Sequence, residues 1–311
     1  MKALALAVLL VTLAGCAPEI PSHQPGPATA PIFVSIVCHN EEPKSASATA
    51  YSEDEAYFMH NRDATVEFAR MLHHEGVRFN FQSDWDFVMG VLRYDHGSHS
   101  TGNKNVLQYL VYNLGFEVDP HAHEKRYNYA DVAHLHDEAG VPVSCLAGGL
   151  IASPPRDSKL EYLWQPLRGA QFDCTWQAEA IWGGATGNHI DEESLWISGI
   201  WKPKDDADFT THDDEAPVPH IGGYRTDWEG LRHLMARQAA GELDASSIYT
   251  QTIFIRQVDL LNSAHVLAFR DEIQALRPAT EAGLVRWAGL NEVLGIWEEE
   301  YDSQPSLLPY V

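Results

Sequence analysis

The 311-residue chain is poor in positive charge, since 21 Lys and Arg stand against 44 Asp and Glu and the net charge is −23. Affinity for nucleic acid comes mainly from clustered Lys and Arg, so this balance argues against a nucleic-acid partner. Long hydrophobic runs are missing too, because the apolar run at the N-terminus is shorter than the roughly 20 residues of a membrane-spanning helix. The glycine motifs of dinucleotide and P-loop sites are also absent.

The N-terminal segment predicts how the chain is delivered. Residues 1–15 contain one Lys and a short apolar core, and Leu-Ala-Gly precedes Cys16. This is typical of a signal peptide, with a short core helix as the alternative, and its end resembles the bacterial lipobox. The resemblance implies that lipidated Cys16 anchors the chain to a membrane of the cell envelope. In a Gram-negative source this would be the outer membrane, because Ala17 stands where an Asp would signal retention in the inner membrane. Residues 16–31, rich in Pro, predict an extended tether.

Cysteine is scarce. If Cys16 carries lipid, three cysteines remain in an oxidising compartment, and three cannot all pair within one chain. A disulfide between Cys145 and Cys174 is one open pairing. Cys38 lies in an apolar run and is expected to pack as a small buried side chain.

Apolar residues are abundant, at 45% of the chain with 9 Trp, 12 Tyr and 11 Phe, which is enough for a packed core. Residues 32–311 have a length that suits one barrel-sized domain. Three successive segments join an amphipathic helix, a glycine that ends it, and a β-rich strand. This alternation predicts an α/β fold with a parallel sheet and helices outside. The predicted pairs are 63–74 with 77–81, 106–114 with 116–118, and 129–139 with 141–143.

Other elements follow from shorter patterns. The nearly continuous β-branched run at 32–37 predicts a first strand that is buried on both faces. Segments rich in Pro, Gly and Asp predict long loops over one end of the sheet. Further predicted strands are 195–201 and 248–257, predicted helices are 228–240 and 266–276, and predicted loops are 152–194 and 202–227.

Sixteen histidines are the unusual feature of the composition, because imidazole is the side chain most used for metal ligation and for proton transfer near neutral pH. Several stand with acidic residues where a predicted strand ends. The carboxyl ends of parallel strands meet at one edge, so these side chains can converge there. Convergent N and O donors suit a divalent cation such as Zn²⁺. The clusters are His39 with Glu41 and Glu42, Asp84 with Asp86, and His121 with His123.

The His121-Ala-His123 element is the sharpest of these clusters, since residues i and i+2 of an extended segment point to the same side. His39 is a candidate third ligand, and Glu41 a candidate base that deprotonates metal-bound water. Asp84 is a further catalytic candidate. The alternatives are solvated loop histidines, an acidic turn before Pro43 and helix capping by Asp84.

The remaining histidines are interpreted from their positions in the predicted helices and loops. Those on predicted helices are expected to be surface or helix-packing residues: His73, His74, His134 and His136. His220 lies between a Pro and two glycines and is a candidate general acid or substrate contact. Aromatic side chains that could stack on sugar rings, or simply form core, are Trp85, Trp182, Trp196, Trp201 and Tyr224.

Taken together, residues 32–300 resemble the polysaccharide deacetylase (NodB-homology) superfamily in element order. Gly115-Phe116-Glu117-Val118-Asp119-Pro120-His121 resembles the third-strand motif that ends in the first metal-binding His. The resemblance implies a distorted (β/α)7-type barrel in a single domain. The family's Asp-Asp pair is replaced by His39-Asn40, its second His has Lys125 in its place, and its Leu-x-His acid is not evident.

The resemblance implies a metal-dependent hydrolase of an envelope or extracellular glycan, most simply a deacetylase. Its metal would be held by His39, His121 and His123, with Glu41 as base, His220 as acid, and Trp85, Trp201 and Tyr224 near the sugar. One alternative is a glycosidase that uses a carboxylate pair drawn from Glu41, Glu42, Asp84, Asp86 and Asp119. Another is a glycan-binding envelope protein without catalytic activity.

Overall fold

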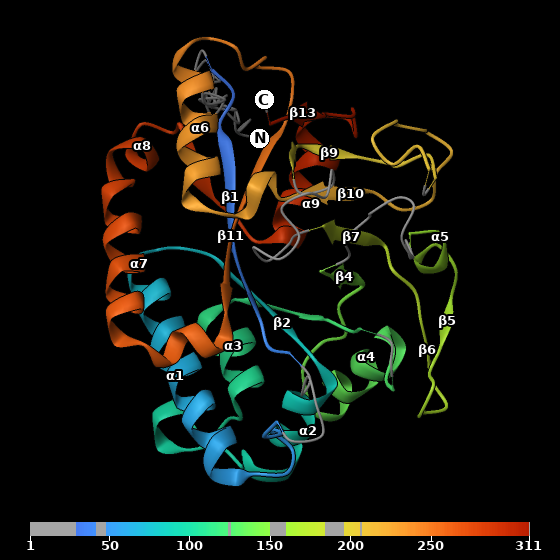
Figure 1. Cartoon of the computed structure of the whole chain (residues 1–311), viewed down its shortest axis with the longest axis vertical. Coiled ribbons are helices and arrows are strands. Elements are labelled where there is room, and N and C mark those ends of the chain that lie inside the picture. The colour runs from blue at the N-terminus through green and yellow to red at the C-terminus, as the bar shows by residue number, and fades with distance from the viewer. Residues whose placement is uncertain are drawn as a thin grey trace, which may run out of the picture.

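The computed structural model describes residues 29–41, 48–123, 126–149, 160–183, 196–205 and 207–310. The signal peptide, Cys16, nearly all of the tether and Glu42 lie outside the described residues. The described chain folds as one mixed α/β unit, with helices packed around two main sheets (Figure 1).

The strands are short apart from the first and the eleventh. They are β1 (Ile32–His39), β2 (Phe79–Ser83), β3 (Glu117–Pro120), β4 (Leu146–Gly148), β5 (Leu167–Arg168), β6 (Thr175–Trp176), β7 (Ala180–Gly183), β8 (Ile197–Ser198), β9 (Ile200–Trp201), β10 (His220–Gly222), β11 (Tyr249–Arg256), β12 (Val285–Trp287) and β13 (Leu308–Pro309). The α-helices are α1 (Glu55–His74), α2 (Trp85–Tyr94), α3 (Val106–Leu114), α4 (Tyr129–Glu138), α5 (Leu160–Leu163), α6 (Trp228–Ala239), α7 (Ser263–Ala275), α8 (Arg277–Glu281) and α9 (Leu290–Glu300).

The first sheet is parallel and is built around β1, which is buried along its whole length. β11 pairs with all of one edge of β1. The other edge is divided, because β12 pairs with its first residues and β2 with its last, and β3 continues the sheet from β2. His39 therefore stands at the carboxyl end of a strand that is fixed on both sides.

The second sheet has the order β4-β7-β10-β9, in which only β9 is antiparallel to its neighbour. It meets the first sheet at two seams. At one, His121 forms a parallel bridge with Gly148, just beyond β3 and at the end of β4. At the other, the Thr252 amide of β11 donates to the Gly223 carbonyl beside β10, at 3.0 Å. The described chain is thus an α/β fold with two largely parallel sheets that are joined at these two seams.

Local sequence explains why the helices begin and end where they do. Asp54 accepts a hydrogen bond from the Tyr57 amide at the start of α1, and Asn105 does the same for the Gln108 amide in α3. Gly115 ends α3 in the left-handed conformation, with φ 67°, as predicted for a helix-to-strand turn. Helices α1 and α3 cover the outer face of β1–β3 through a large apolar cluster that includes Phe68 and Phe79.

Several element predictions need correction. The segment 141–143 is not a strand; β4 begins at Leu146, because a turn follows Gly140. The predicted loops 152–194 and 202–227 contain β7 and β10 of the second sheet. The Cys145–Cys174 disulfide does not form, since both cysteines are free, whereas Cys38 is fully buried as expected.

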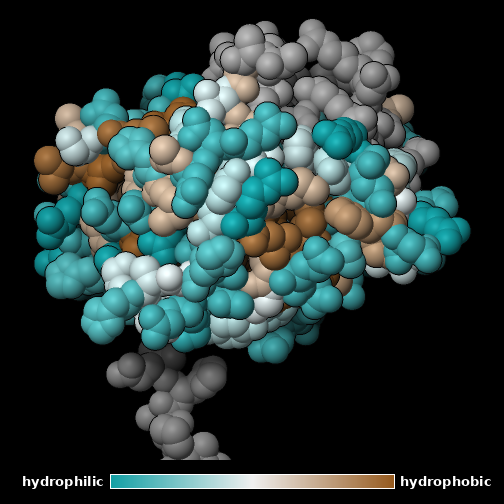
Figure 2. All heavy atoms as spheres, turned by 90° about the horizontal axis from the view of Figure 1, so that it is seen from below, coloured by the Kyte–Doolittle hydropathy of each residue, from teal (hydrophilic) through white to brown (hydrophobic). Residues whose placement is uncertain are grey.

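Figure 2 shows a face on which hydrophilic residues predominate and apolar side chains appear in small groups. This agrees with the large excess of acidic residues. None of the helices in the described ranges combines the length and the apolar character that a bilayer crossing requires.

Candidate metal centre

Three strand ends bring together the histidines that the sequence singled out. His39 is the last residue of β1 and lies opposite Gln82 of β2 in the parallel register. His121 directly follows β3 and bridges to Gly148 of β4. The imidazole rings of His39 and His121 stack at this edge, with 4.2 Å between their centroids.

A compact set of donor atoms is formed by His39, Glu41 and His121, whose donors all lie within 4.8 Å of one another. One carboxylate oxygen, Glu41 Oε1, lies 3.9 Å from His39 Nδ1 and 4.0 Å from His121 Nε2. Around a tetrahedral Zn²⁺ at 2.0–2.1 Å, donors stand about 3.4 Å apart, so the two distances to Glu41 Oε1 exceed this spacing by only about 0.5–0.6 Å. Two imidazoles and a carboxylate are also a donor set of catalytic zinc sites, and the residues present therefore fit such an ion.

In both His39 and His121, the ring nitrogen that faces away from Glu41 lies next to a hydrogen-bond acceptor. His121 Nδ1 lies 2.9 Å from the Gly148 carbonyl, which also accepts from the Tyr129 hydroxyl at 2.9 Å. His39 Nε2 contacts Gln82 Oε1. A neutral imidazole carries one N–H, so donation outward leaves the lone pairs of His39 Nδ1 and His121 Nε2 directed at Glu41.

Close packing holds both rings. The edges of Trp182 and Phe254 meet the His39 ring at 5.6 and 4.8 Å between centroids. Gly149, at φ +80°, passes so close that a Cβ there would lie 2.6 Å from His39 Cε1 and 2.8 Å from His121 Nδ1. The absence of a side chain at Gly149 thus provides the space in which the two histidines sit.

His123 occupies a different position from the predicted one. Its Nε2 lies 3.2 Å from Glu41 Oε2, the oxygen that does not face the other histidines, and its Nδ1 lies 3.9 Å from Asp84 Oδ2. His123 thus stands between two carboxylates, outside the three-donor set, and Glu41 stands inside it. The geometry therefore places Glu41, the predicted base, within the three-donor set and His123, a predicted ligand, outside it. Their exposed fractions of 28% and 34% leave this side of the cluster open to solvent.

The electrostatics favour a neutral His39 imidazole next to an ionised Glu41 carboxylate. Burial alone would raise the pKa of Glu41, but the hydrogen bond to His123, the largest opposing cause, and the proximity of the histidines hold that pKa below its ordinary value. Burial, followed by the proximity of His121, lowers the pKa of His39 well below its ordinary value. Neutral imidazole and ionised carboxylate are the forms that bind a cation.

Three predicted site residues lie elsewhere. His220 is fully buried at the start of β10 and packs against Trp201 and Phe209, in the cluster under α4 and α5. Trp201 is fully buried in that cluster, so it offers no face to a sugar. Tyr224 is also fully buried, with its hydroxyl on His233 at 2.9 Å. The full burial of all three side chains is at odds with the predicted general-acid role of His220 and the predicted stacking roles of Trp201 and Tyr224.

The remaining candidates have mixed outcomes. Asp84 is buried beside His123 and also caps α2, accepting from the Asp86 amide at 3.1 Å. Trp85 is half-buried next to it and stacks on Tyr127 at 4.5 Å. Asp86 faces away from the cluster, where its carboxylate accepts from the Tyr51 and Ser52 amides.

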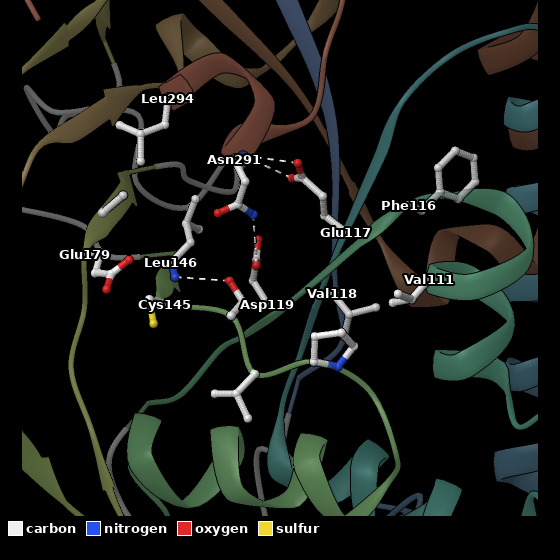
Figure 3. A pocket seen from close by; sticks show the side chains of 14 residues that line it. Val111, Phe116, Glu117, Val118, Asp119, Cys145, Leu146, Glu179, Asn291 and Leu294 are labelled. Atoms are coloured by element: carbon white, nitrogen blue, oxygen red, sulfur yellow. Dashed lines mark hydrogen bonds between the residues drawn. The ribbon is translucent and has the colours of Figure 1, made fainter. Parts of the chain in front are cut away.

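A cavity lies at the amino ends of the strands, opposite the edge that carries the metal donors (Figure 3). It is a cavity of about 370 Å³ whose lining includes Glu117, Asp119, Glu179 and Asn291. Glu117 accepts from backbone amides at the start of α9, including Leu290 N at 2.7 Å, and Asn291 donates to Asp119 at 3.4 Å. Burial and the charge of Glu117 raise the pKa of Asp119 to about 7. Glu117 and Asp119 thus hold the start of α9 through hydrogen bonds and lie apart from the metal donors.

Known proteins resemble the chain in structure rather than in sequence. No family model matches the chain, and a search of curated proteins finds no match. A probable polysaccharide deacetylase from Pseudomonas aeruginosa PAO1 superposes with TM-score 0.53 and 14% identity, over 88% of this chain and 93% of that one. Puue allantoinase superposes with TM-score 0.52 and 12% identity, over 93% and 98%. The chain shares the fold of these two proteins.

A 4-alpha-glucanotransferase from Thermococcus litoralis gives TM-score 0.47 at 10% identity over 85% of this chain, which spans only 38% of that enzyme.

Sequence reasoning missed the residues that support the histidines. Gln82 and the Gly148-Gly149 pair occupy positions that are apparent only once β2 and β4 are in register with β1 and β3. The one available signal was the double glycine, which often marks close backbone approach.

Proposed function

We propose that the chain is a metal-dependent hydrolase whose divalent ion is held by His39, Glu41 and His121. The observation that carries the proposal is the convergence of these donors at the carboxyl ends of the strands, with the outward ring nitrogens already engaged. The same edge is where enzymes of barrel and open-sheet folds place their sites. The fold shared with a polysaccharide deacetylase and an allantoinase supports hydrolysis.

When bound, a divalent ion supplies Lewis-acid polarisation and makes a coordinated water more acidic. The chain's own groups then have separate tasks. His39 and His121 would offer neutral nitrogens to the ion, while Glu41 would provide the negative charge and contacts His123 through Oε2. His123, held between Glu41 and Asp84 and partly open to solvent, is placed to take up or release a proton at Nε2, and Asp84 orients its ring.

For the substrate we propose an acetylated glycan, from which the enzyme removes acetyl groups. Support comes from the motif resemblance at Gly115–His121 and from the shared fold. The glycosidase alternative is weaker, because Asp86 and Asp119 are engaged in backbone and helix contacts away from the open edge. A glycan-binding protein without turnover is the outcome to expect if metal binds and no acetate is released.

Two broader proposals accompany this one. Because backbone or bridge contacts join the sheets at both seams, we propose that β1, β2, β3, β4, β7, β10 and β11 form a distorted seven-stranded barrel. We also propose that Cys16 is lipidated and places the enzyme in the cell envelope. Mass spectrometry of the mature N-terminus after expression in a bacterium would reveal the diacylglycerol, and an unmodified Cys16 would contradict the anchor.

The test of the activity uses purified protein with metal content measured by plasma mass spectrometry. We expect about one divalent ion per chain, loss of that ion in His121→Ala, and acetate release from N-acetylated oligosaccharides by the wild type. His123→Gln is expected to keep the ion and lose activity by about 100-fold, as for removal of a general acid or base. His134→Ala, on the outer face of α4 and paired with Glu138, is the matched control. Wild-type protein that takes up no metal would overturn the proposal.

A further inference from the structure

Gln82 lies beneath the metal donors and touches one of them. It is fully buried in β2, opposite His39 in the register, and its Oε1 contacts His39 Nε2. The other ring nitrogen, Nδ1, faces Glu41 at 3.9 Å. The Gln82 amide and the Glu41 carboxylate therefore lie next to different nitrogens of the His39 ring.

Packing alone does not account for a glutamine at this position. Its amide nitrogen has no hydrogen-bond partner among the described residues, and an unmet buried donor costs about 1–3 kcal/mol. The neighbouring strand also leaves room for the amide, because a Cβ at Gly148 would lie 2.5 Å from Gln82 Cδ. An apolar residue of similar size would fill this space without the cost.

The aromatic neighbours of His39 fix the plane of its ring but not the position of its proton. Trp182 and Phe254 meet the ring at 89° and 87°, and neither offers an acceptor to its nitrogens. An acceptor at Nε2 holds the proton there and leaves the lone pair at Nδ1. Gln82 Oε1 is that acceptor.

We propose that Gln82 is a positioning residue of the metal centre, which fixes His39 in the tautomer that ligates through Nδ1 while His121 ligates through Nε2. The inference rests on the proposed function, since a cation is what the Nδ1 lone pair would bind. Because the partner is an amide rather than a carboxylate, Glu41 stays the one anion of the donor set, and the loaded centre keeps a net positive charge for an incoming carbonyl oxygen.

The first experiment measures Zn²⁺ affinity by competition with a chromophoric chelator. Gln82→Met is expected to bind 10- to 100-fold more weakly, the usual loss when a hydrogen-bond partner of a ligating histidine is removed. Its Co²⁺-loaded form is expected to show an altered visible absorption spectrum. Gln82→Glu retains an acceptor at the same position and is expected to bind at least as tightly as the wild type.

The matched control is Gln251→Met. Gln251 is another buried glutamine, whose amide donates to the Asp227 carbonyl at 3.2 Å, away from the metal donors. This variant is expected to lose stability and to keep its Zn²⁺ affinity. A loss of affinity in Gln251→Met equal to that in Gln82→Met would overturn the proposal, because general destabilisation would then explain both.

A second measurement needs no metal. In metal-free protein with ¹⁵N-labelled histidine, the signal that disappears in His39→Gln is expected to report protonated Nε2 and unprotonated Nδ1, and Gln82→Met is expected to shift this tautomer ratio. Unchanged affinity and an unchanged ratio would overturn the role of Gln82 and leave the metal centre standing. Wild-type protein without metal affinity would instead overturn the proposed function, while the tautomer still tests Gln82.

Discussion

A single carboxylate, Glu41, links the two parts of the cluster. Its Oε1 faces His39 and His121, and its Oε2 contacts His123. The sequence predicted that these residues would be neighbours, because parallel strands end at one edge. It could not predict which residue would bind and which would move protons, since that division depends on side-chain directions in the turn after β1.

We expect Glu41→Gln to weaken Zn²⁺ binding by at least tenfold, because the amide keeps the shape of the side chain and removes the one negative charge of the donor set. Competition with a chromophoric chelator measures the change. Glu53→Gln, an exposed substitution before α1, is the control. Equal affinity of Glu41→Gln and wild type would remove Glu41 from the donor set.

His220 predicts an acid-sensitive fold. Burial lowers its pKa to about 3, so the folded state stays neutral where the unfolded state, near pKa 6.5, takes up a proton. Stability is therefore lost as the pH falls from 6.5 towards 3, by at most about 1.4 kcal/mol per pH unit. Buried His136, with its pKa also lowered to about 3, adds the same dependence.

We expect His220→Leu to flatten the decline of unfolding free energy between pH 6.5 and 4, measured by urea denaturation. The exposed His60 provides the control substitution His60→Leu, which should leave the slope as it is. A slope in His220→Leu as steep as that of the wild type would show that the buried ring is not responsible.

At the scale of elements, the turn after β4 is as important to the site as the strands that carry its ligands. The predicted strand at 141–143 had the wrong position, and only the register of β4 shows that Gly148 faces Gln82 and that Gly149, directly after the strand, faces the two histidines. The helix–glycine–strand pattern predicted α1, α3, α4, β2 and β3, and the continuous β-branched run at 32–37 predicted β1. β7 and β10, with four and three residues, are too short to show one and depend on long-range pairing.

Gly149→Ala tests this turn. A side chain at φ +80° is strained, and its Cβ would meet His39 and His121. We expect a stability loss of about 1–2 kcal/mol and a clear loss of Zn²⁺ affinity. Gly76→Ala, at φ +73° with no atom within 4 Å of the new Cβ, carries similar strain without the contact. Gly76→Ala should therefore lose stability and keep its Zn²⁺ affinity. Equal Zn²⁺ affinity in both variants would show that Gly149 is not needed for the site.

At the scale of the molecule, a shared apolar cluster and a small number of hydrogen bonds join the two sheets, and Thr250 makes several of these hydrogen bonds. Its hydroxyl accepts from the Gly199 amide at 2.8 Å and donates to the Gly222 carbonyl at 2.7 Å. The sequence predicted a parallel α/β fold and the strand that carries Thr250. It could not predict this seam, because the partners lie in segments that were expected to be a strand and a loop.

We expect Thr250→Val to lower the unfolding free energy by about 1–3 kcal/mol, because it keeps the shape of the side chain and leaves two buried backbone groups without a partner. Denaturation in urea measures the loss. Thr280→Val, which removes only a hydroxyl contact within α8, should cost less. A smaller loss at Thr250 than at Thr280 would show that the seam does not depend on this hydroxyl.

The pairing of β1 with β11 has a consequence for the order in which the protein is made. His39, Glu41 and His121 all leave the ribosome early, yet the strand that lines one whole edge of β1 begins at Tyr249, 249 − 32 = 217 residues after Ile32. A nascent chain that stops before β11 carries every proposed ligand on an incompletely paired strand. Capture of the metal is therefore expected to follow completion of the chain rather than to accompany its synthesis.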